Sequence, residues 1–466
     1  MANNNSCRKN IYEIYKTMEY GPVLDSASLG EAWLKGRKFG PFIDGSWIQE
    51  SGGGKEIHNP CTGHHIATVV NSSQGDVDRA VASSATAFLS WKQLSGYDRA
   101  KYLYSLARHL QKNVSLLVQV ESLNRGVQTS DPREFDVPAA VRHFYHYAGW
   151  AQLIHSDLKG WEPQGVVVGI LSSCCPLAML AWIIAPALAA GNTVCLRPSI
   201  KTPLPAMLLA HIAIEAGLPA GVLNMLPGGS DVAQQLILHN DVAHITFSGQ
   251  TSIGRQIIQA TAGCSKKLTM LLSGRTPMLV FDTADTDSAS DSILKDAWFN
   301  QGQVPWAVTQ LLVQESIFKD FAEKLKKRLN KVAIGRAFDK MADIGQPCSS
   351  QTVVNVRQAI TKAVEKGLEV FQVKVPDHLS QDLFFPPTLV FGGQLESNQV
   401  VGEDTIAPVV TVTPFRTTKE AIALANNTRY GVAASVWTEN AALALEVAAH
   451  LEVACLYMIA VGMKRS

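Results

Sequence analysis

The chain has almost no excess of charge of either sign. It has 41 Lys and Arg residues against 40 Asp and Glu residues, for a formal net charge of +1. A protein that binds nucleic acid or an anionic membrane through bulk electrostatics needs a marked positive excess. The one basic cluster, Lys324 to Arg328, follows a helical pattern with Phe321, which favours a solvated helix face. The composition therefore predicts no nucleic-acid partner and no membrane attachment.

The cysteines lack the spacing of a metal site. There are eight, at positions 7, 61, 174, 175, 195, 264, 348 and 455, with no CxxC pair and no Cys/His cluster. Scattered thiols of this kind fit a reducing compartment. The first nine residues, from Met1 to Lys9, have no apolar core and so are not expected to be a secretory signal. The sequence predicts a cytoplasmic protein without a metal.

Charge is also missing from Gly165 to Asn192, a stretch long enough to cross a bilayer. Ser172, Pro176 and Pro186 interrupt it, and no basic or aromatic belt flanks it. A buried parallel strand, a loop and a buried helix account for it better.

What the chain does have is length and apolar content. Its 466 residues, 47% of them hydrophobic, are enough for a large core and two domains or more. After a hairpin around Asp44-Gly45 come helices that Asp76 and Asp98 are expected to cap, then one over Val137–Ala151. Expected strands follow at Val166–Leu171, Asn192–Leu196, Val222–Leu226, Ala243–Phe247, Met278–Phe281, Gln310–Gln314, Pro408–Pro414, Ala433–Trp437 and Leu456–Ile459. Helical patterns lie between most of these strands, so the alternation predicts a doubly wound α/β fold.

One strand end has the form of a phosphate site. The expected strand Ala243–Phe247 runs through Gly249 into a helix beginning near Thr251. Free N–H groups at a helix start can face a phosphate, and glycine lets the backbone approach closely. A plain strand-to-helix connection would use the same residues, so this motif alone leaves both interpretations open.

Several blocks in the right order resemble the NAD(P)-dependent aldehyde dehydrogenases. They begin with Phe299-Asn-Gln-Gly-Gln303, which is similar to the approach to the family's nucleophilic cysteine. The others are Gly165–Pro176, Ala189–Pro198, Glu215–Pro219, Phe247–Gly254 and Ala425–Gly431. The resemblance covers about Phe42 to Ile459 and implies the aldehyde dehydrogenase-like fold. It implies a Rossmann-type cofactor domain over residues 41–271 and a catalytic-type domain over 272–460, after an N-terminal extension over 1–40.

The resemblance also assigns positions to the chemistry. A thiolate attacks the aldehyde carbon, donors hold the oxyanion, and a carboxylate activates water. The expected thiol position is Pro305, the base position is Leu271, and the oxyanion amide position is Cys174, beside Ser173. The resemblance implies that NAD or NADP is held by four residues of the cofactor domain and one of the catalytic-type domain: Arg197, Gly229, Gly249, Gly254 and Asp404.

These replacements predict a catalytically impaired member of the family with an interaction or scaffold role and an unidentified protein partner. Losing a nucleophile that acts in a concerted set costs on the order of 10⁴–10⁶ in rate. The alternative is an NAD(P)-dependent oxidoreductase acting on the aldehyde or oxo group of donors through an atypical site, with Cys174 or Cys175 as a relocated nucleophile. The cluster of His143, His146 and Tyr147 favours satisfied histidines at an interface over a metal site.

Assembly is expected to differ from that of common family members. Only Gln152–Glu162 separates the helix from the next strand, which is too short for the family's pairing hairpin of two strands of ~5–6 residues plus a turn. That gap, Pro305 and the motif Gly160-Trp-Glu-Pro163 most resemble the first domain of the class 16 aldehyde dehydrogenases. The stop soon after Ile459, with 461–466 as a short tail, suggests a truncated copy, so the usual family oligomer is doubtful.

Overall fold

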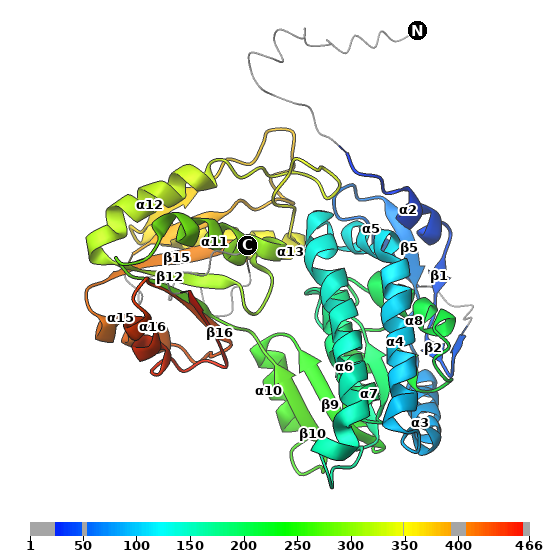
Figure 1. Cartoon of the computed structure of the whole chain (residues 1–466). Coiled ribbons are helices and arrows are strands. Elements are labelled where there is room, and N and C mark those ends of the chain that lie inside the picture. The colour runs from blue at the N-terminus through cyan, green and yellow to red at the C-terminus, as the bar shows by residue number, and fades with distance from the viewer. Residues whose placement is uncertain (1–23, 49–53, 348, 393–406, 460–466) are drawn as a thin grey trace, which may run out of the picture.

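The protein is built from two seven-stranded sheets that follow one another along the chain. The computed structural model describes residues 24–48, 54–347, 349–392 and 407–459. Figure 1 shows the N-terminal half, coloured blue to green, on one side and the C-terminal half, coloured green-yellow to red, on the other. Asp404, the expected tail at 461–466 and most of the N-terminal extension lie outside the described residues.

The first sheet has the strand order β10-β9-β6-β7-β8-β2-β3. Its strands are β2 (Phe42–Ile43), β3 (Ser46–Trp47), β6 (Val166–Ile170), β7 (Thr193–Arg197), β8 (Leu223–Met225), β9 (Val242–Ser248) and β10 (Lys267–Leu271). All neighbouring pairs from β10 to β8 are parallel, while the β2–β3 hairpin at Asp44-Gly45 forms an antiparallel edge. Val166–Ile170 is buried along its whole length, as expected of a central parallel strand. The doubly wound α/β fold predicted from the sequence is confirmed.

Helices cover both faces of this sheet. They are α3 (Gln74–Trp91), α4 (Gly96–Lys112), α5 (Val114–Arg125), α6 (Val137–Asp157), α7 (Pro176–Ala189), α8 (Leu204–Glu215), α9 (Ser230–Leu238) and α10 (Thr251–Ala260). The helices α4, α5, α6, α7 and α8 build the larger core. The residues of α3 and α9 pack in a separate cluster with β6 and β9. A short helix α2 (Ser28–Leu34) and a small sheet of β1 (Lys38–Phe39), β5 (His65–Val69) and β4 (Lys55–His58) stand beside them.

Two helix starts differ from the sequence prediction. Ser73 and Ser95 are the N-caps of α3 and α4, and their hydroxyls accept the backbone N–H of Asp76 at 3.2 Å and of Asp98 at 3.1 Å. Each aspartate instead stands three residues into its helix. The Asp76 carboxylate accepts the Ser73 N–H in return at 2.8 Å, which completes a capping box. The expectation that Asp76 and Asp98 are the caps was therefore wrong by three residues.

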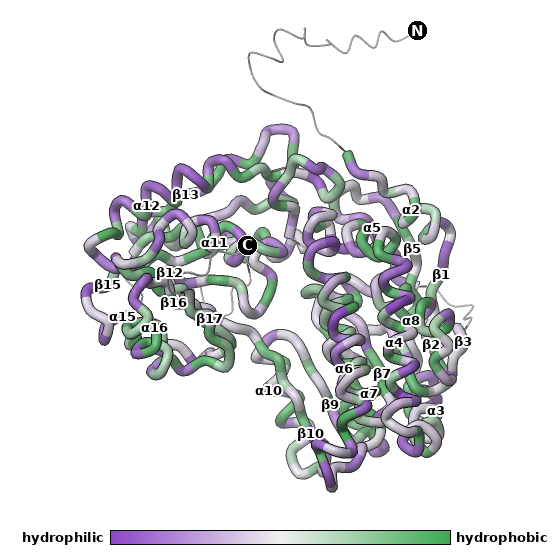
Figure 2. The backbone as a smooth tube through the Cα atoms, viewed as in Figure 1, coloured by the Kyte–Doolittle hydropathy of each residue, from purple (hydrophilic) through white to green (hydrophobic). Residues whose placement is uncertain are grey.

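The second sheet has the strand order β13-β14-β15-β12-β11-β16-β17. Its strands are β11 (Thr276–Val280), β12 (Val308–Gln314), β13 (Glu369–Gln372), β14 (Thr388–Phe391), β15 (Val409–Phe415), β16 (Ala433–Trp437) and β17 (Cys455–Ile459). Its helices are α11 (Thr286–Trp298), α12 (Glu315–Leu329), α13 (Ser350–Glu365), α15 (Thr418–Asn426) and α16 (Ala441–Ala448). All pairs are parallel except β13 with β14. Figure 2 shows α12 as a mostly hydrophilic helix, consistent with the solvated face predicted for its basic cluster.

The segment between α6 and β6 forms no strand. The helix α6 runs to Asp157 rather than ending near Ala151, so only residues 158–165 remain, and all of them are described as turn or coil. Eight residues are too few for a hairpin of two ordinary strands. The pairing hairpin is absent from this place in the chain, and the loop is shorter than the sequence suggested.

The uncharged stretch from Gly165 to Asn192 lies in the protein core. It forms the buried strand β6 and the helix α7, whose residues are nearly all buried. Among the described residues, no helix is both long enough and apolar enough to cross a bilayer.

Candidate dinucleotide site

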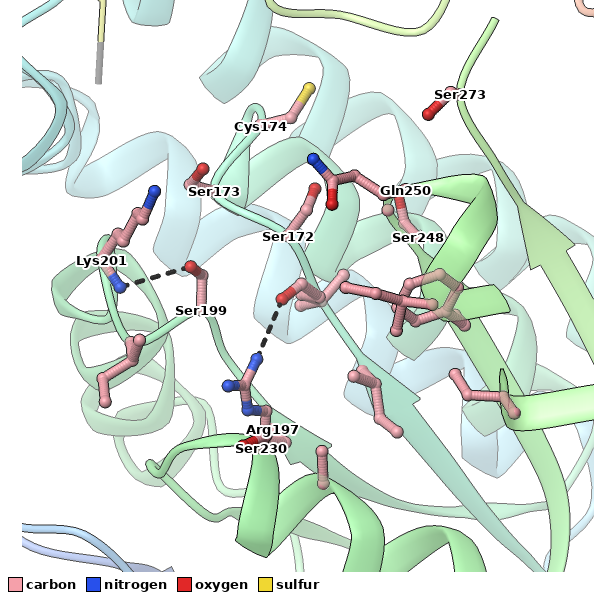
Figure 3. Close-up of a pocket in the computed structure, with 18 of the residues that line it drawn as sticks. Ser172, Ser173, Cys174, Arg197, Ser199, Lys201, Ser230, Ser248, Gln250 and Ser273 are labelled. Atoms are coloured by element: carbon pink, nitrogen blue, oxygen red, sulfur yellow. Dashed lines mark hydrogen bonds between the residues drawn. The ribbon is translucent and has the colours of Figure 1, made fainter. Parts of the chain in front are cut away.

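A cavity of about 910 Å³ opens at the carboxyl ends of β6, β7 and β9. The chain goes from β6 outward to β7 and β8, then returns to the other side of β6 with β9. This reversal of strand order is the place where doubly wound α/β proteins bind ligands. Residues of the second half also line the cavity, among them Asn300, Pro305 and Thr352. Figure 3 shows part of the lining, with Arg197, Cys174 and Gln250 around the opening.

The carboxyl end of β7 places a cation in the cavity lining. Arg197 is the last residue of β7, and one of its terminal nitrogens donates to the Leu171 carbonyl at 3.4 Å. Its Nε is buried and has no hydrogen bond with any described residue. Burial lowers the pKa of Arg197, and the nearby Asp231 carboxylate opposes this effect. A guanidinium stays charged in proteins, so Arg197 contributes to the cavity lining a cation that also carries one buried donor without a partner among the described residues.

The glycines of the expected cofactor set fall in different places. Gly249 lines the cavity, whereas Gly254 lies in α10, where a Cβ would stand 2.5 Å from a Leu272 methyl. Gly254 thus allows α10 to pack closely on the segment that follows β10. Gly229 is the N-cap of α9, next to Ser230, which lines the cavity.

The start of α10 lacks a side-chain cap. Gln250 is its N-cap without a side-chain hydrogen bond, and the Thr251 hydroxyl is buried with no partner among the described residues. The N–H of Gly249 itself donates to the Leu271 carbonyl at 3.1 Å. The first N–H groups of α10 rather than that of Gly249 are therefore the ones left to receive an anion.

Pro305 lines the cavity at the position expected for the nucleophile. A Cβ at Gly274 would lie 2.1 Å from the Pro305 carbonyl oxygen, so only glycine allows the two segments to touch. Leu271, at the expected base position, is half-buried against the larger core and is not part of the lining. Ser273, two residues further on, does line the cavity. Proline has neither a nucleophilic atom nor an N–H.

Cys174 and Cys175 occupy the loop before α7, and a buried carboxylate fixes the end of this loop. Cys174 lines the cavity and is half-buried, while Cys175 is fully buried and has a left-handed φ of 40°. The helix α7 begins directly after them without a side-chain cap of its own. Glu121 of α5 supplies that cap, because one of its oxygens accepts the Leu177 N–H at 2.9 Å. The loop geometry therefore depends on a residue about fifty positions earlier in the chain.

A buried ionic cluster continues beneath this loop. Arg125 donates to Glu121 at 3.1 Å, to Asp136 at 2.6 Å and to the Asn300 side-chain oxygen at 2.5 Å. Burial raises the pKa of Glu121 to about 7, against the opposing charge of Arg125. Burial likewise raises the pKa of the neighbouring Asp131 to about 7. Because Arg125 is neutralised inside the cluster, its charge is not free for a ligand.

The other sulfur and imidazole groups are poor candidates for chemistry. The contact with Cys174, followed by burial, raises the pKa of Cys175 well above its usual range. Cys195 is fully buried in β7, 3.2 Å from the Ser84 hydroxyl, and burial raises its pKa to about 11. Burial, with smaller effects of His146 and Arg142, lowers the pKa of His143 to about 4. Rings surround His143, with the centroid of Trp182 at 5.5 Å, and no group of three or more potential metal ligands occurs among the described residues.

The fold and the position of the cavity define a doubly wound α/β protein with a ligand cavity at the reversal of its strand order. Comparison with known proteins narrows this class. The family model described as "Aldehyde dehydrogenase family" matches residues 47–462. Betaine aldehyde dehydrogenase of Bacillus subtilis is 33% identical over 434 residues, which cover 90% of this chain and 88% of that protein. Retinal dehydrogenase 2 of Homo sapiens is 31% identical over 434 residues, which cover 90% and 83%.

Solved structures agree with these relatives. Betaine aldehyde dehydrogenase from Staphylococcus aureus, determined in complex with NAD⁺, matches with a TM-score of 0.87 at 30% identity, covering 93% of this chain and 89% of that one. A mutant of the aldehyde dehydrogenase from Bacillus cereus matches with a TM-score of 0.88 at 28% identity, covering 96% and 92%. The chain belongs to the aldehyde dehydrogenase family, and its fold is the aldehyde dehydrogenase fold.

The sequence prediction missed several residues that the fold brings to the cavity. They come from loops, helix starts and the end of α5, and are spread over both halves of the chain: Arg125, Ser199, Lys201, Ser230, Gln250, Ser273, Asn300 and Gln303. One signal was available for Ser199, Lys201 and Ser230, because polar residues directly after two successive parallel strands share one sheet edge. No such signal exists for Arg125, which reaches the cavity from a helix packed beneath it.

Proposed function

We propose that this chain binds NAD or NADP in the cavity and does not oxidise aldehydes through a thiol at position 305. The observation that carries the proposal is Pro305 in the lining of an otherwise formed dinucleotide cavity. The buried, unpaired Nε of Arg197 and the uncapped start of α10 fit the phosphates and ribose of a dinucleotide. When bound, the nicotinamide would supply a hydride acceptor, and the protein would supply binding and orientation.

The same proposal includes an interaction or scaffold role and kinship with the class 16 aldehyde dehydrogenases. Its support is the combination of Pro305 with the strandless segment 158–165. Three large apolar side chains are exposed in this region: Trp150 and Leu153 on α6, and Trp161 in the segment that follows it. Residues 158–165 form no strand that could cover them. An apolar surface of this kind suits a protein partner.

A second candidate is an oxidoreductase that acts on the aldehyde or oxo group of its donors through Cys174. Two observations favour it. Cys174 lines the cavity, unlike Cys195, and the relatives named above are called dehydrogenases. Its difficulty is activation, since a reactive cysteine needs a nearby cation or base and Arg125 is already engaged by Glu121 and Asp136.

Two measurements test the proposal and separate it from the second candidate. Isothermal titration with NAD and with NADP should detect binding, because the cavity and its donors are present in the apoprotein. An absorbance assay for reduced nucleotide with short and aromatic aldehydes should then give no signal for the parent protein. The parent, a Cys174→Ala variant and a control variant at the exposed Cys264 should be alike. Reduction that disappears in Cys174→Ala but persists in Cys264→Ala would establish the oxidoreductase instead, and absence of all nucleotide binding would refute the proposal itself.

A further inference from the structure

Two cysteines follow each other in the loop before α7. Cys174 is half-buried and lines the cavity, and Cys175, the next residue, is the N-cap of α7. Their side chains are in hydrogen-bond contact with each other. Figure 3 shows Cys174 at the tip of its loop, with the sulfur directed away from Arg197. The pair is therefore a dithiol whose first member is reached from the cavity.

We propose that Cys174 and Cys175 together form a covalent binding site for monosubstituted trivalent arsenicals, the class of compound to which phenylarsine oxide belongs. An arsenic atom that carries one organic group has two exchangeable positions, so it pairs with two thiols. Soft sulfur ligands select soft, thiophilic elements of this kind. The inference goes beyond the proposed function, because it requires neither a bound nucleotide nor catalytic activity.

The reaction transfers no electrons between the partners. The arsenic–oxygen double bond and the two S–H bonds break, two arsenic–sulfur bonds form, and the oxygen leaves with both protons as one water molecule. Arsenic stays trivalent, and neither sulfur is oxidised. Contact with Cys174, followed by burial, raises the pKa of Cys175, so this thiol keeps its proton at neutral pH. That proton does not block the reaction, because the arsenic-bound oxygen takes it up.

Buried donors hold the second sulfur in place. A terminal nitrogen of Arg125 donates to the Cys175 sulfur at 3.9 Å, and the side-chain amide nitrogen of Asn300 donates to it at 3.7 Å. Groups that are fixed before binding lose less conformational freedom when the ligand closes the ring. Arg125 and Asn300 therefore preorganise the dithiol for a ligand that binds both sulfurs.

A disulfide is the competing use of two neighbouring thiols, and the backbone disfavours it. The Cα atoms of consecutive residues are about 3.8 Å apart, whereas disulfides usually join Cα atoms about 4.4–6.8 Å apart. An arsenic atom between the two sulfurs enlarges the ring by one member and relaxes this constraint. Inorganic arsenite has three exchangeable positions, but within the described ranges no group of three or more potential metal ligands occurs. The pair therefore suits an arsenical that needs only two thiols.

The surroundings of the pair suit an aromatic substituent on arsenic. A small buried apolar cluster includes Cys175, and Cys174 packs against it. Three aromatic side chains pack against the same cluster: Phe135, Phe299 and Trp306. The centroid of the Phe135 ring lies 4.9 Å from that of Phe299 and 6.0 Å from that of Trp306. Aromatic rings of this kind favour contact with a further ring, so we expect an aryl substituent to bind better than a charged one.

The test uses phenylarsine oxide on the purified, reduced full chain. Intact-mass spectrometry should show one phenylarsenic group per chain in the presence of millimolar glutathione, a monothiol. Alkylation after denaturation should then find two fewer free thiols than in the untreated chain. Addition of dimercaptopropanol, a small dithiol, should remove the group, because it offers arsenic the same two bonds.

Three variants assign the binding to residues. Cys174→Ser and Cys175→Ala each leave one thiol of the pair, so each should bind phenylarsine oxide at least about hundredfold more weakly under glutathione competition, as expected when two linked contacts become one. Cys264→Ser removes an exposed cysteine elsewhere and is the matched control, which should behave like the parent. Circular dichroism checks the fold of Cys175→Ala, and Cys174→Ser carries the test if that buried replacement unfolds the chain.

The outcomes decide the proposal without reference to nucleotide binding. Loss of affinity in Cys174→Ser alongside an unchanged Cys264→Ser would support the dithiol site. Parent-like affinity in Cys174→Ser, or an equal loss in Cys264→Ser, would refute it, because arsenic would then be held by other thiols. Failure of the parent to retain phenylarsine oxide against glutathione would refute it as well. Titration with NAD and NADP tests the proposed function separately.

Discussion

At the scale of single residues, the cavity combines an intact frame with substituted chemistry. Pro305 and Cys174 line the cavity, and Arg197 keeps an unpaired donor there. The backbone near these positions has left-handed φ angles at Cys175, Asn300 and Gln301. Strained backbone of this kind is common at functional sites. The buried Arg125 cluster fixes these segments relative to one another.

The first residue-scale prediction concerns Arg125. Arg125→Ala leaves Glu121 and Asp136 buried without their cation, so the free energy of unfolding should fall by about 3–5 kcal/mol. Urea denaturation followed by circular dichroism measures this change. Arg416→Ala is the control, because its ion pair with Glu315 is exposed and screened by solvent, so its loss should change the free energy of unfolding far less. Similar losses in the two variants would contradict the role given to the buried cluster.

A second residue-scale prediction restores the missing reagents. The double variant Pro305→Cys/Leu271→Glu places a thiol in the cavity lining and a carboxyl on the strand that leads to it. We expect it to form reduced nucleotide from an aldehyde at least about tenfold above the parent, because the loss of a nucleophile costs several orders of magnitude. Pro305→Ser/Leu271→Glu is the control without a thiol. Equal rates in both double variants would mean that the frame no longer positions a substrate.

At the scale of elements, helix starts decide how the N-terminal half is anchored. The helix α3 has a complete capping box, and α4 has a serine cap. The helix α7, by contrast, depends on Glu121 from another helix. The sequence placed the starts of the first two helices to within three residues, but it gave Asp76 and Asp98 as the caps instead of Ser73 and Ser95. It could not show the third, because that cap comes from a distant segment.

The caps yield an element-scale prediction. Ser73→Ala should lower the free energy of unfolding by about 1 kcal/mol, because the N–H of Asp76 loses its acceptor at the start of α3. Ser90→Ala, on the exposed side of the same helix, should change it by less than about 0.5 kcal/mol. Urea midpoints of the two variants measure both effects, and a Ser90 effect as large as the Ser73 effect would contradict the capping assignment.

At the scale of the whole molecule, stability should depend on pH through buried carboxyls. The pKa of Asp131 in the folded protein is about 7, raised mainly by burial, whereas an ordinary aspartate titrates near 3.8. Between these values the folded chain keeps a proton that the unfolded chain releases. Protonation therefore stabilises the fold, and the free energy of unfolding should fall as the pH rises from about 4 to about 7. Glu121, with a pKa also raised to about 7, acts in the same direction.

Replacement of Asp131 tests this dependence. Asp131→Asn mimics the protonated carboxyl at every pH, so its stability relative to the parent should rise between pH 5 and pH 8 by on the order of 2 kcal/mol. Thermal unfolding at several pH values measures the difference. The variant of the exposed Asp377 to Asn is the control and should follow the parent profile. Parallel profiles for Asp131→Asn and the parent would contradict the assignment.

The sequence by itself determined the fold class, because strands buried on both faces are uninterrupted apolar runs and the helices between them keep their own period. It also determined most elements of the first sheet and the family resemblance, which depends on ordered short blocks. It misjudged the caps at Asp76 and Asp98 and the end of α6, since helix boundaries depend on one or two hydrogen bonds at each end. The strands β1, β4, β5, β10, β13 and β14 were not predicted. The first three form the small sheet, β10 and β13 are edge strands, and β14 lies next to β13.

Only the tertiary structure decided what the cavity contains. Arg125, Asn300 and Cys175 lie far apart in the sequence, and their contacts come from the packing of α5, the loop before α7 and the segment after α11. The same holds for the composition of the lining, which depends on which side chains the two halves turn toward each other. Local pattern fixes the elements because backbone geometry is periodic, whereas a site between two sheets depends on contacts that no local period encodes.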